Sequence, residues 1–365
     1  MLKRFEVQGF KNFKDKVILD FSDSSEYKFN TQCISNKLIR EMIIYGKNGV
    51  GKTNFGLALF DIVGTLTDKN VGDDLYSRYL NADSLDRYAS FKYVFEFDKN
   101  IIEYFYVKSS KDEFIEETLT LNYKILINRN INLTEPDLTG ISEITPTLNW
   151  KYKDERSLVA YAIHNSSLEP DHPLYKLMDY VSHMLWVRNL NYNRYVGYKT
   201  NTLDYYSFIF EKKYLKEFEN FLNENDIDEH LVARENEEGK KELCFDKTVP
   251  LNFFKTASSG TISLYTSFYW MKTCPDISLF FLDEFDSFYH FELSEAIVKL
   301  LGKMTKTQVI FTSHNTNLLS NSIMRPDCFF ILTKGGLKSF ANSTKRELRE
   351  GHNLEKLYQS GEFNE

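Results

Sequence analysis

The residues most directly tied to chemistry form a short loop, residues 46–53, whose sequence GKNGVGKT has the pattern G-x-x-x-x-G-K-[ST]. Glycines in this pattern let backbone N–H groups converge on phosphate oxygens, and the N-terminus of the following helix favours negative charge. Lys52 would reach the terminal phosphates, and the Thr53 hydroxyl would ligate Mg²⁺. The predicted nucleotide-binding residues are Gly46, Asn48, Gly49, Val50, Gly51, Lys52, Thr53 and Asn54.

An ordinary glycine-rich turn before a helix is the alternative interpretation of this loop. The apolar run Met42–Tyr45 precedes the loop and is typical of a buried strand. The apolar residues within Thr53–Leu66 have helical spacing, which predicts a helix after the loop. Strand, loop and helix are the context that the phosphate-binding pattern requires. The sequence therefore predicts a site for ATP and Mg²⁺.

A pair of carboxylates follows a second apolar run, Leu279–Leu282. A phosphate loop requires a metal-organising carboxylate at the end of a neighbouring buried strand. Asp283 would hold Mg²⁺, directly or through water, and Glu284 would polarise the attacking water as general base. Two surface acids at a strand end are a common alternative, but the complete phosphate loop upstream favours the functional interpretation.

Two further segments indicate which class of P-loop protein this is. Residues 257–261 contain a Ser-x-Gly core ahead of an apolar helical run, which resembles an ABC signature but taken alone is also a serine-rich helix N-cap. His314 follows the strand-like run Val309–Thr312, at the position of the switch histidine that contacts the γ-phosphate in that class. The order of the four motifs favours the ABC class. The predicted signature residues, acting on a second subunit, are Ser258, Ser259, Gly260 and Thr261.

The elements that position these residues follow from the hydrophobic pattern. Met1–Phe10 and Lys16–Phe21 predict a starting hairpin, and alternating runs further on predict an antiparallel meander. The meander runs are Phe91–Phe97, Ile101–Val107 and Glu117–Ile127. A hairpin is expected within His230–Phe245, and the runs before Asp283 and His314 predict two parallel core strands.

These elements predict an α/β fold: an ABC-type P-loop ATPase core, with a mixed or parallel sheet flanked by helices, an antiparallel β lobe and a mainly helical insertion. We expect residues 1–145 to form the N-terminal part of the core and residues 231–365 its C-terminal part. Residues 146–230 would be the insertion, because apolar and aromatic residues recur there at three- and four-residue spacing.

In the residues and the order of these motifs, the chain resembles the ABC-type ATPases related to RecF, SMC and overcoming-lysogenization-defect proteins. Residues 5–13 are similar to the first hairpin of that group, and residues 352–363 resemble the tail of compact bacterial members found in antiphage defence loci. The similarity covers residues 1–100 and 245–365. It implies ATP and Mg²⁺ as ligands and an ATP-sandwich homodimer, with a higher oligomer left open.

The chain departs from the family pattern in three places. The signature has one glycine where transporters have two. Residues 286–290 stand where transporters have the D-loop aspartate, and no convincing Q-loop glutamine is found, since the glutamines lie in the wrong regions. These glutamines are Gln8, Gln32, Gln308 and Gln359.

Composition limits the partners. The net charge of −7 gives no general attraction to nucleic acid. No apolar stretch reaches the roughly 20 residues that a membrane span needs, and the four dispersed cysteines indicate neither a zinc site nor a disulfide framework. We expect a cytoplasmic protein without a membrane partner.

Two functions remain open at this point. In the first, the dimeric ATPase is a sensor or regulator of an antiphage defence system and controls an effector encoded nearby. The alternative is a DNA-repair or chromosome-maintenance ATPase that binds DNA directly. A nuclease within the chain is not expected, because the segment after His314 shows no acidic metal-binding cluster. The aromatic segment Tyr175–Leu222 would dock an effector or, nearly as well, simply cap the ATPase core.

Overall fold

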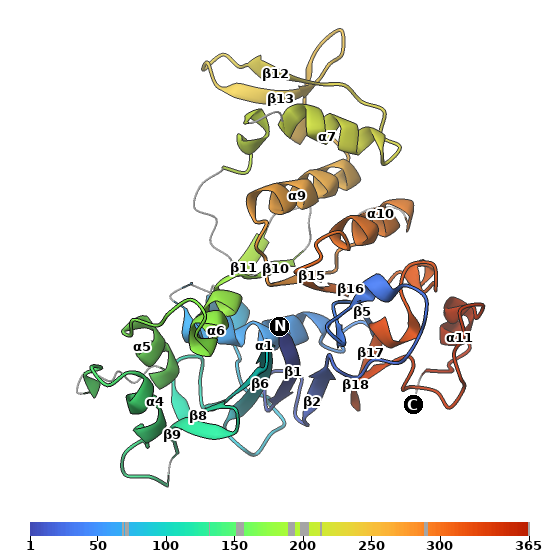
Figure 1. Ribbon diagram of the computed structural model, residues 1–365. Coiled ribbons are helices and arrows are strands. Elements are labelled where there is room, and N and C mark those ends of the chain that lie inside the picture. The colour runs from blue at the N-terminus through green and yellow to red at the C-terminus, as the bar shows by residue number, and fades with distance from the viewer. Residues whose placement is uncertain are drawn as a thin grey trace.

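The computed structural model of the chain describes residues 1–67, 69, 73–130, 132–150, 157–188, 194–197, 204–211, 214–287 and 291–363. Two large sheets with helices between and around them make up most of this part of the chain (Figure 1). The predicted α/β class is confirmed: the core sheet is mixed, and an antiparallel lobe lies beside it.

A seven-stranded sheet forms the core, and its five inner strands run parallel. In spatial order its strands are β11 (Arg194–Gly197), β10 (Met184–Arg188), β15 (Leu279–Asp283), β16 (Gln308–Thr312), β5 (Glu41–Tyr45), β17 (Phe329–Thr333) and β18 (Gly336–Ser339). Every residue of β5, β15 and β16 is buried, as expected for parallel strands that are covered on both faces. β15 and β16 are the two parallel core strands that the sequence predicts.

The second large sheet is antiparallel throughout and contains both the predicted starting hairpin and the predicted meander. Its strands, in spatial order, are β2 (Val17–Asp20), β1 (Leu2–Gln8), β6 (Ala89–Phe97), β7 (Asn100–Lys108), β8 (Phe114–Leu121) and β9 (Lys124–Arg129). The run Glu117–Ile127 is not one strand, because the chain turns back at Asn122 and Tyr123. Both residues have positive φ, 49° and 68°, as a tight hairpin turn requires, although they lack the usual glycine.

Helix α1 (Lys52–Leu59) lies between the two large sheets (Figure 1). On one side Gly56 lies so close to the core sheet that a Cβ atom there would come within 2.8 Å of Phe281 and Trp186. On the other side the rings of Phe55 and Phe5 are 5.7 Å apart, centroid to centroid. The phosphate loop therefore leads into a helix that both sheets hold.

The predicted helix over 53–66 is divided into α1 and α2 (Asp61–Leu66) at Phe60. The division coincides with the buried Asp61, whose carboxylate accepts hydrogen bonds from Tyr79 (2.8 Å), Tyr106 (2.9 Å) and the Lys108 ammonium (2.9 Å). A buried charge needs such partners. The contacts with this acid attach the start of α2 to the antiparallel sheet.

On the other face of the core sheet lie α7 (Tyr214–Asn223), α9 (Ser259–Thr273) and α10 (Phe291–Leu301), with a small sheet beyond them (Figure 1). That sheet contains β12 (Leu231–Glu235), β13 (Lys241–Phe245) and β14 (Leu251–Asn252), the first two being the predicted hairpin. The remaining elements are β3 (Ile34–Ser35), β4 (Leu38–Ile39), α3 (Asp73–Tyr76), α4 (Thr139–Ile144), α5 (Leu158–His164), α6 (Pro173–Ser182), α8 (Phe253–Thr256), α11 (Leu354–Gln359) and the 3-10 helices η1 (Thr31–Cys33), η3 (Phe208–Phe210), η4 (Thr316–Leu318) and η5 (Pro326–Cys328).

The middle of the chain, residues 146–230, is mainly helical in its described part, but it also adds β10 and β11 to the core sheet. β10 is almost wholly apolar and buried, and the sequence does not predict it, because apolar and aromatic residues of this segment recur at helical spacing. The predicted segment also includes residues 151–156, 189–193, 198–203 and 212–213, which lie outside the described residues. The three-part domain division stays a prediction.

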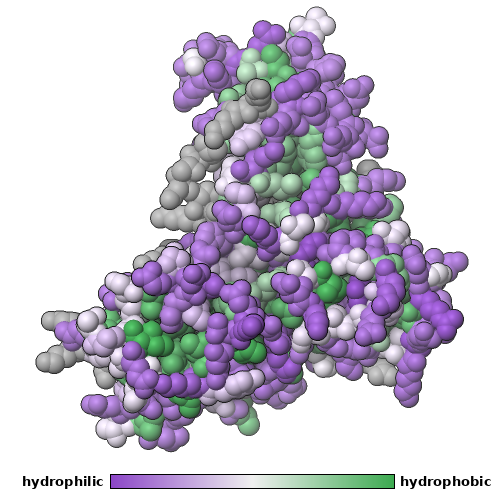
Figure 2. Space-filling model, in the orientation of Figure 1, coloured by the Kyte–Doolittle hydropathy of each residue, from purple (hydrophilic) through white to green (hydrophobic). Residues whose placement is uncertain are grey.

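Most described aromatic side chains of Tyr175–Leu222 pack inward. Phe208 and Phe218 are fully buried, and the Phe208 ring lies 5.3 Å from that of Tyr265 and 4.9 Å from that of Tyr269, both on α9. This packing favours the cap interpretation over a docking surface. The face drawn in Figure 2 is mostly polar, with apolar residues in scattered patches. None of the described helices combines the length and apolar character needed to cross a bilayer.

Candidate nucleotide-binding site

The predicted phosphate loop, acid pair and switch histidine gather at the carboxyl edge of the core sheet. β5 leads into the phosphate loop, β15 ends at Asp283, and β16 lies between these two strands and leads to His314. Ligands of α/β sheets bind outside the carboxyl ends of the strands. Tertiary structure thus places the loop, the acids and the histidine at one edge, although they lie far apart in the sequence.

The phosphate loop passes directly into α1. Gly51 precedes the helix with φ of 109°, in the left-handed region that favours glycine. A side chain there would also approach Asn12 and Phe13 to 3.3 Å. Asn54, in the first turn of the helix, donates a hydrogen bond to the Asn12 side chain. The loop has the form of an anion site at a helix N-terminus.

Lys52, the first residue of α1, is only 6% exposed. Its Nζ atom donates to the carbonyl oxygen of Gly46 (2.9 Å) and lies 2.7 Å from Nε2 of His314. Burial lowers the pKa of Lys52, and the charges of nearby carboxylates, Asp283 first, oppose this shift. Because an ammonium group only donates, the contact assigns His314 a neutral ring that accepts at Nε2 and carries its proton on Nδ1.

The electrostatics of His314 agree with this assignment. Burial and the charge of Lys52 lower the pKa of His314 from its ordinary value of 6.5, whereas Glu284 raises it. Two cationic groups 2.7 Å apart would repel each other strongly. The neutral histidine therefore connects the loop after β16 to the phosphate loop.

Asp283 is fully buried at the end of β15. The Thr312 hydroxyl donates to its Oδ1 atom (2.7 Å), whereas Oδ2 is buried without a hydrogen-bond partner in the part of the chain that the structure describes. Burial raises the pKa of Asp283, and the hydroxyl groups of Thr312 and Thr53 lower it. A buried carboxylate oxygen without a partner, beside the Thr53 hydroxyl, fits Mg²⁺, which is commonly held by one or two carboxylates together with phosphates.

Glu284 has an unusual backbone. Its φ of 49° lies in the left-handed region, which costs a non-glycine residue on the order of 1 kcal/mol or more and recurs at functional sites. The Glu284 N–H group donates to the Thr312 Oγ1 atom (2.7 Å), and that hydroxyl in turn donates to Asp283. Thr312 of β16 therefore forms hydrogen bonds with both residues of the acid pair, with the carboxylate of Asp283 and with the backbone of Glu284.

An acid that the sequence did not assign completes this edge. The Ser313 hydroxyl donates to the carboxylate of Asp286, and the Asn315 N–H group donates to the Ser313 Oγ atom (2.8 Å). Burial raises the pKa of Asp286. Asp286 therefore ties the loop after β15 to the loop that carries His314. The remaining residues at the D-loop position, 288–290, lie outside the described part of the chain.

A cavity of about 770 Å³ lies beside the phosphate loop, within the size range of small-molecule sites. Its walls are the phosphate loop, the loop Asn12–Val17 after β1 and the β17–β18 turn, with Tyr358 of α11. Of these walls the sequence assigned only the phosphate loop, although the loop Asn12–Val17 and Tyr358 fall in the two segments that resemble the family. The cavity has room for the nucleoside part of a nucleotide.

The signature residues lie elsewhere. Ser258 is the N-cap of α9: its Oγ atom accepts from the Thr261 N–H group (3.1 Å) and lies 2.8 Å from the Thr261 hydroxyl oxygen. This is the helix cap that the alternative interpretation predicts. α9 lies across the core sheet from α1 (Figure 1). Within one chain, the structure therefore does not bring Ser258–Thr261 to the phosphate loop.

The Gln308 side chain has a structural role, because its hydrogen bonds join separate elements of the fold. Its Oε1 atom accepts from the Leu2 N–H group (2.9 Å) and the Tyr180 hydroxyl (2.6 Å), and its Nε2 atom donates to the Leu2 carbonyl (2.9 Å). These bonds join β16 to β1 and α6. Gln308 lies at the start of β16, at the opposite end of the strand from His314, in agreement with the inference that it is no metal-side glutamine.

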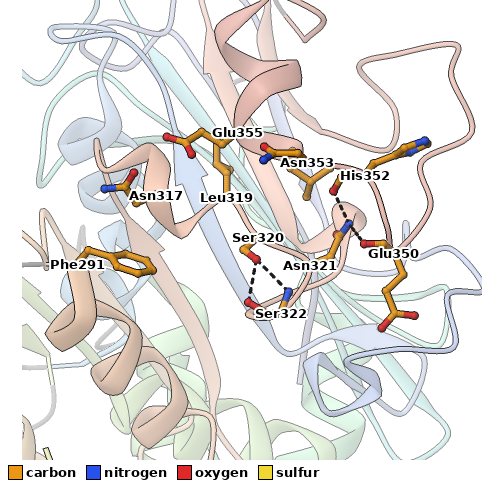
Figure 3. A pocket seen from close by; sticks show the side chains of 11 residues that line it. Phe291, Asn317, Leu319, Ser320, Asn321, Ser322, Glu350, His352, Asn353 and Glu355 are labelled. Carbon is orange, nitrogen blue, oxygen red and sulfur yellow. Dashed lines mark hydrogen bonds between the residues drawn. The ribbon is translucent and has the colours of Figure 1, made fainter.

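A second pocket, of about 510 Å³, is lined in part by the switch loop, which is the segment 313–322 that follows β16 and carries His314 (Figure 3). Here the Asn321 amide donates to the carbonyl groups of Arg349 (3.1 Å), Glu350 (2.9 Å) and His352 (3.1 Å). No predicted site residue lines this pocket. Its polar contacts anchor the C-terminal segment to the loop that follows His314.

Comparison with known protein families assigns most of this sequence to one family. The family model described as "AAA domain, putative AbiEii toxin, Type IV TA system" matches residues 42–320, which is more than half of the chain. No curated protein matches the sequence.

Solved structures with some similarity include an SMC head bound to the C-winged-helix domain of ScpA, with TM-score 0.46 and 14% identity over 93% of this chain and 97% of that one. The SMC head domain from Thermotoga maritima has TM-score 0.45 and 16% identity over 92% and 97%. A RecF–ATP structure has TM-score 0.38 and 15% identity over 93% and 99%.

The contact between Lys52 and His314 predicts an abnormal histidine titration. In the nucleotide-free protein the His314 pKa should lie below 6.5, so the native state gains a second cation beside Lys52, and loses stability, as the pH falls through that lowered pKa. Lys52→Met should raise the His314 pKa, because the repulsion is removed. The measurement is NMR titration of ¹⁵N-histidine-labelled protein, with the resonance assigned by His314→Gln.

Lys47→Met is the matched control, since Lys47 is an exposed lysine of the same loop. It should leave the His314 titration nearly unchanged. An equal shift in both variants, or none in Lys52→Met, would contradict the paired geometry.

Proposed function

The chain belongs to the AAA-domain family that matches residues 42–320, and we propose that it is a Mg²⁺-dependent ATPase of the ABC type that acts as a nucleotide-dependent dimeric switch. The observation that carries the proposal is the approach of Lys52 to His314 at 2.7 Å, beside the buried Asp283. One edge of the sheet thereby offers a phosphate-binding cation, a metal-organising carboxylate and a neutral hydrogen-bonding ring.

In the proposed reaction, Lys52 and the N-terminus of α1 bind the β- and γ-phosphates, and Thr53 and Asp283 hold Mg²⁺. The ion would neutralise charge that develops on the phosphate oxygens. Glu284 takes a proton from water as the water oxygen bonds to the γ-phosphorus. The bond from this phosphorus to the β–γ bridging oxygen breaks, and ADP and phosphate leave. His314 donates a hydrogen bond from its Nδ1–H group to a γ-phosphate oxygen and keeps its proton.

We propose that a second copy of the chain completes the site. Ser258 and the N-terminus of the 15-residue helix α9 form a donor-rich surface of the kind that binds anions, but α9 lies across the sheet from Lys52 of its own chain (Figure 1). In a head-to-tail dimer Ser258–Thr261 of one subunit would close over the γ-phosphate bound by the other. ATP binding and dimerisation would then be linked.

Removing the general base separates binding from turnover. Glu284→Gln keeps the side-chain shape, so ATP·Mg²⁺ should still bind while steady-state hydrolysis falls by roughly 10²-fold or more. Lys52→Ala should instead weaken binding measured by calorimetry, because the triphosphate loses its main side-chain cation. Unchanged hydrolysis in Glu284→Gln would move the base elsewhere, and wild-type affinity in Lys52→Ala would refute the phosphate-loop assignment.

Mixing two inactive variants tests the composite site. A heterodimer of Lys52→Ala and Ser258→Arg chains retains one site in which both halves are intact, whereas each homodimer has none. Hydrolysis should therefore recover on mixing, towards half of the wild-type rate per dimer if the two sites act independently. Native mass spectrometry would verify that heterodimers form. Heterodimers without recovered activity would show that the site is completed within one chain.

We further propose that the switch controls an effector in another polypeptide, as a sensor or regulator of an antiphage defence system. The family description names a toxin, and a switch whose own chemistry is ATP hydrolysis needs an output elsewhere. Direct DNA binding by a repair or chromosome-type ATPase is the alternative. The net charge of −7 argues against it, because DNA binding draws most of its affinity from lysine and arginine contacts with phosphates.

Nucleotide-dependent capture distinguishes these outputs. Wild type and Glu284→Gln, purified from the native host, should retain a specific protein partner in different amounts, because the variant stays in the ATP-bound state. DNA binding by the same preparations would be measured by fluorescence anisotropy over a series of salt concentrations. Tight, ATP-dependent DNA binding without a protein partner would favour the alternative function.

A further inference from the structure

Arg188 is the last residue of β10, and strand register determines its place. β10 pairs in parallel with β15, and Arg188 lies opposite Asp283. Neighbouring strands are about 4.8 Å apart. Arg188 therefore stands at the same carboxyl edge as the acid pair, on the side of β15 away from β16.

The alternation of side chains determines the face to which Arg188 points. Trp186 pairs with Phe281, and both lie against α1, where a Cβ atom at Gly56 would come within 2.8 Å of each. Residues two apart on a strand point to the same face. Arg188 and Asp283 thus project towards the face that holds α1, from which Lys52 also enters the site.

Among the described residues, Arg188 has no structural partner that would account for its position. It is exposed, and in the described ranges it makes neither a hydrogen bond nor an ion pair. Arg40 and Arg325, by contrast, are buried and paired with Glu41 and Asp327. The charge of Arg188 nevertheless acts on its neighbour, since it lowers the pKa of Asp283. An arginine beside the metal-organising acid has its guanidinium available for a ligand.

We propose that Arg188 is a further catalytic residue, which binds the terminal phosphate of ATP from the β10 side of the metal site while Lys52 binds it from the other side. This inference rests on the proposed ATPase function. A guanidinium group matches two phosphate oxygens at once. Negative charge on the γ-phosphate oxygens must be stabilised in the transition state, and a positioned arginine supplies such stabilisation.

The test compares ligands with and without a γ-phosphate. Calorimetry would measure the affinities of ADP·Mg²⁺ and of a non-hydrolysable ATP analogue with Mg²⁺ for wild type, Arg188→Ala and Arg188→Lys. In Arg188→Ala we expect the analogue to bind about tenfold more weakly while ADP binds as before. The kcat should fall on the order of 10²-fold. Arg188→Lys should recover part of both losses, because it keeps the charge but not the two-pronged geometry.

Arg234→Ala is the matched control, because Arg234 is an exposed arginine on β12, far from α1 (Figure 1). It should change neither affinity. Equal losses for ADP and the analogue, or an unchanged affinity ratio in Arg188→Ala, would overturn the role of Arg188 while leaving the ATPase function intact. Wild-type protein that does not bind the analogue would refute the proposed function, and the role of Arg188 with it.

Discussion

The buried ammonium group of Lys52 is the interaction on which the rest of the site depends. A charge in this position requires partners, and they come from separate parts of the chain: the Gly46 carbonyl within the same loop, the His314 ring after β16 and the carboxylates after β15. These partners hold three strand ends in one arrangement. A bound triphosphate would enter as a further and stronger partner for the same cation.

The framework around this cation is held from two sides. α1 is packed between the core sheet at Gly56 and the antiparallel sheet at Phe5, and Gln308 joins the two sheets through hydrogen bonds to Leu2. A helix held in this way offers little freedom to the loop at its N-terminus. Preorganisation of that kind is what positioning and electrostatic catalysis of phosphoryl transfer require.

The C-terminal segment connects two parts of the site that the core sheet does not connect directly. Tyr358 of α11 lines the cavity beside the phosphate loop, and Glu355 of the same helix accepts a hydrogen bond from Thr316, two residues beyond His314 (2.9 Å). Asn321 holds the segment that leads into α11. A displacement of the switch loop would therefore also move Tyr358 and change the shape of the cavity beside the phosphate loop.

The local chemistry could be predicted from the sequence, because phosphate loops and buried parallel strands are specified by residues that are close together in the chain. The pattern of residues 46–53, the apolar runs before Asp283 and His314, and the α/β class could all be predicted on that basis. Which distant residues meet is known only from the folded chain. The contact of His314 with Lys52, the support that Thr312 gives to both acids and the register that places Arg188 beside Asp283 depend on strand order. Strand order arises from long-range pairing, which leaves no periodic signal in a single sequence.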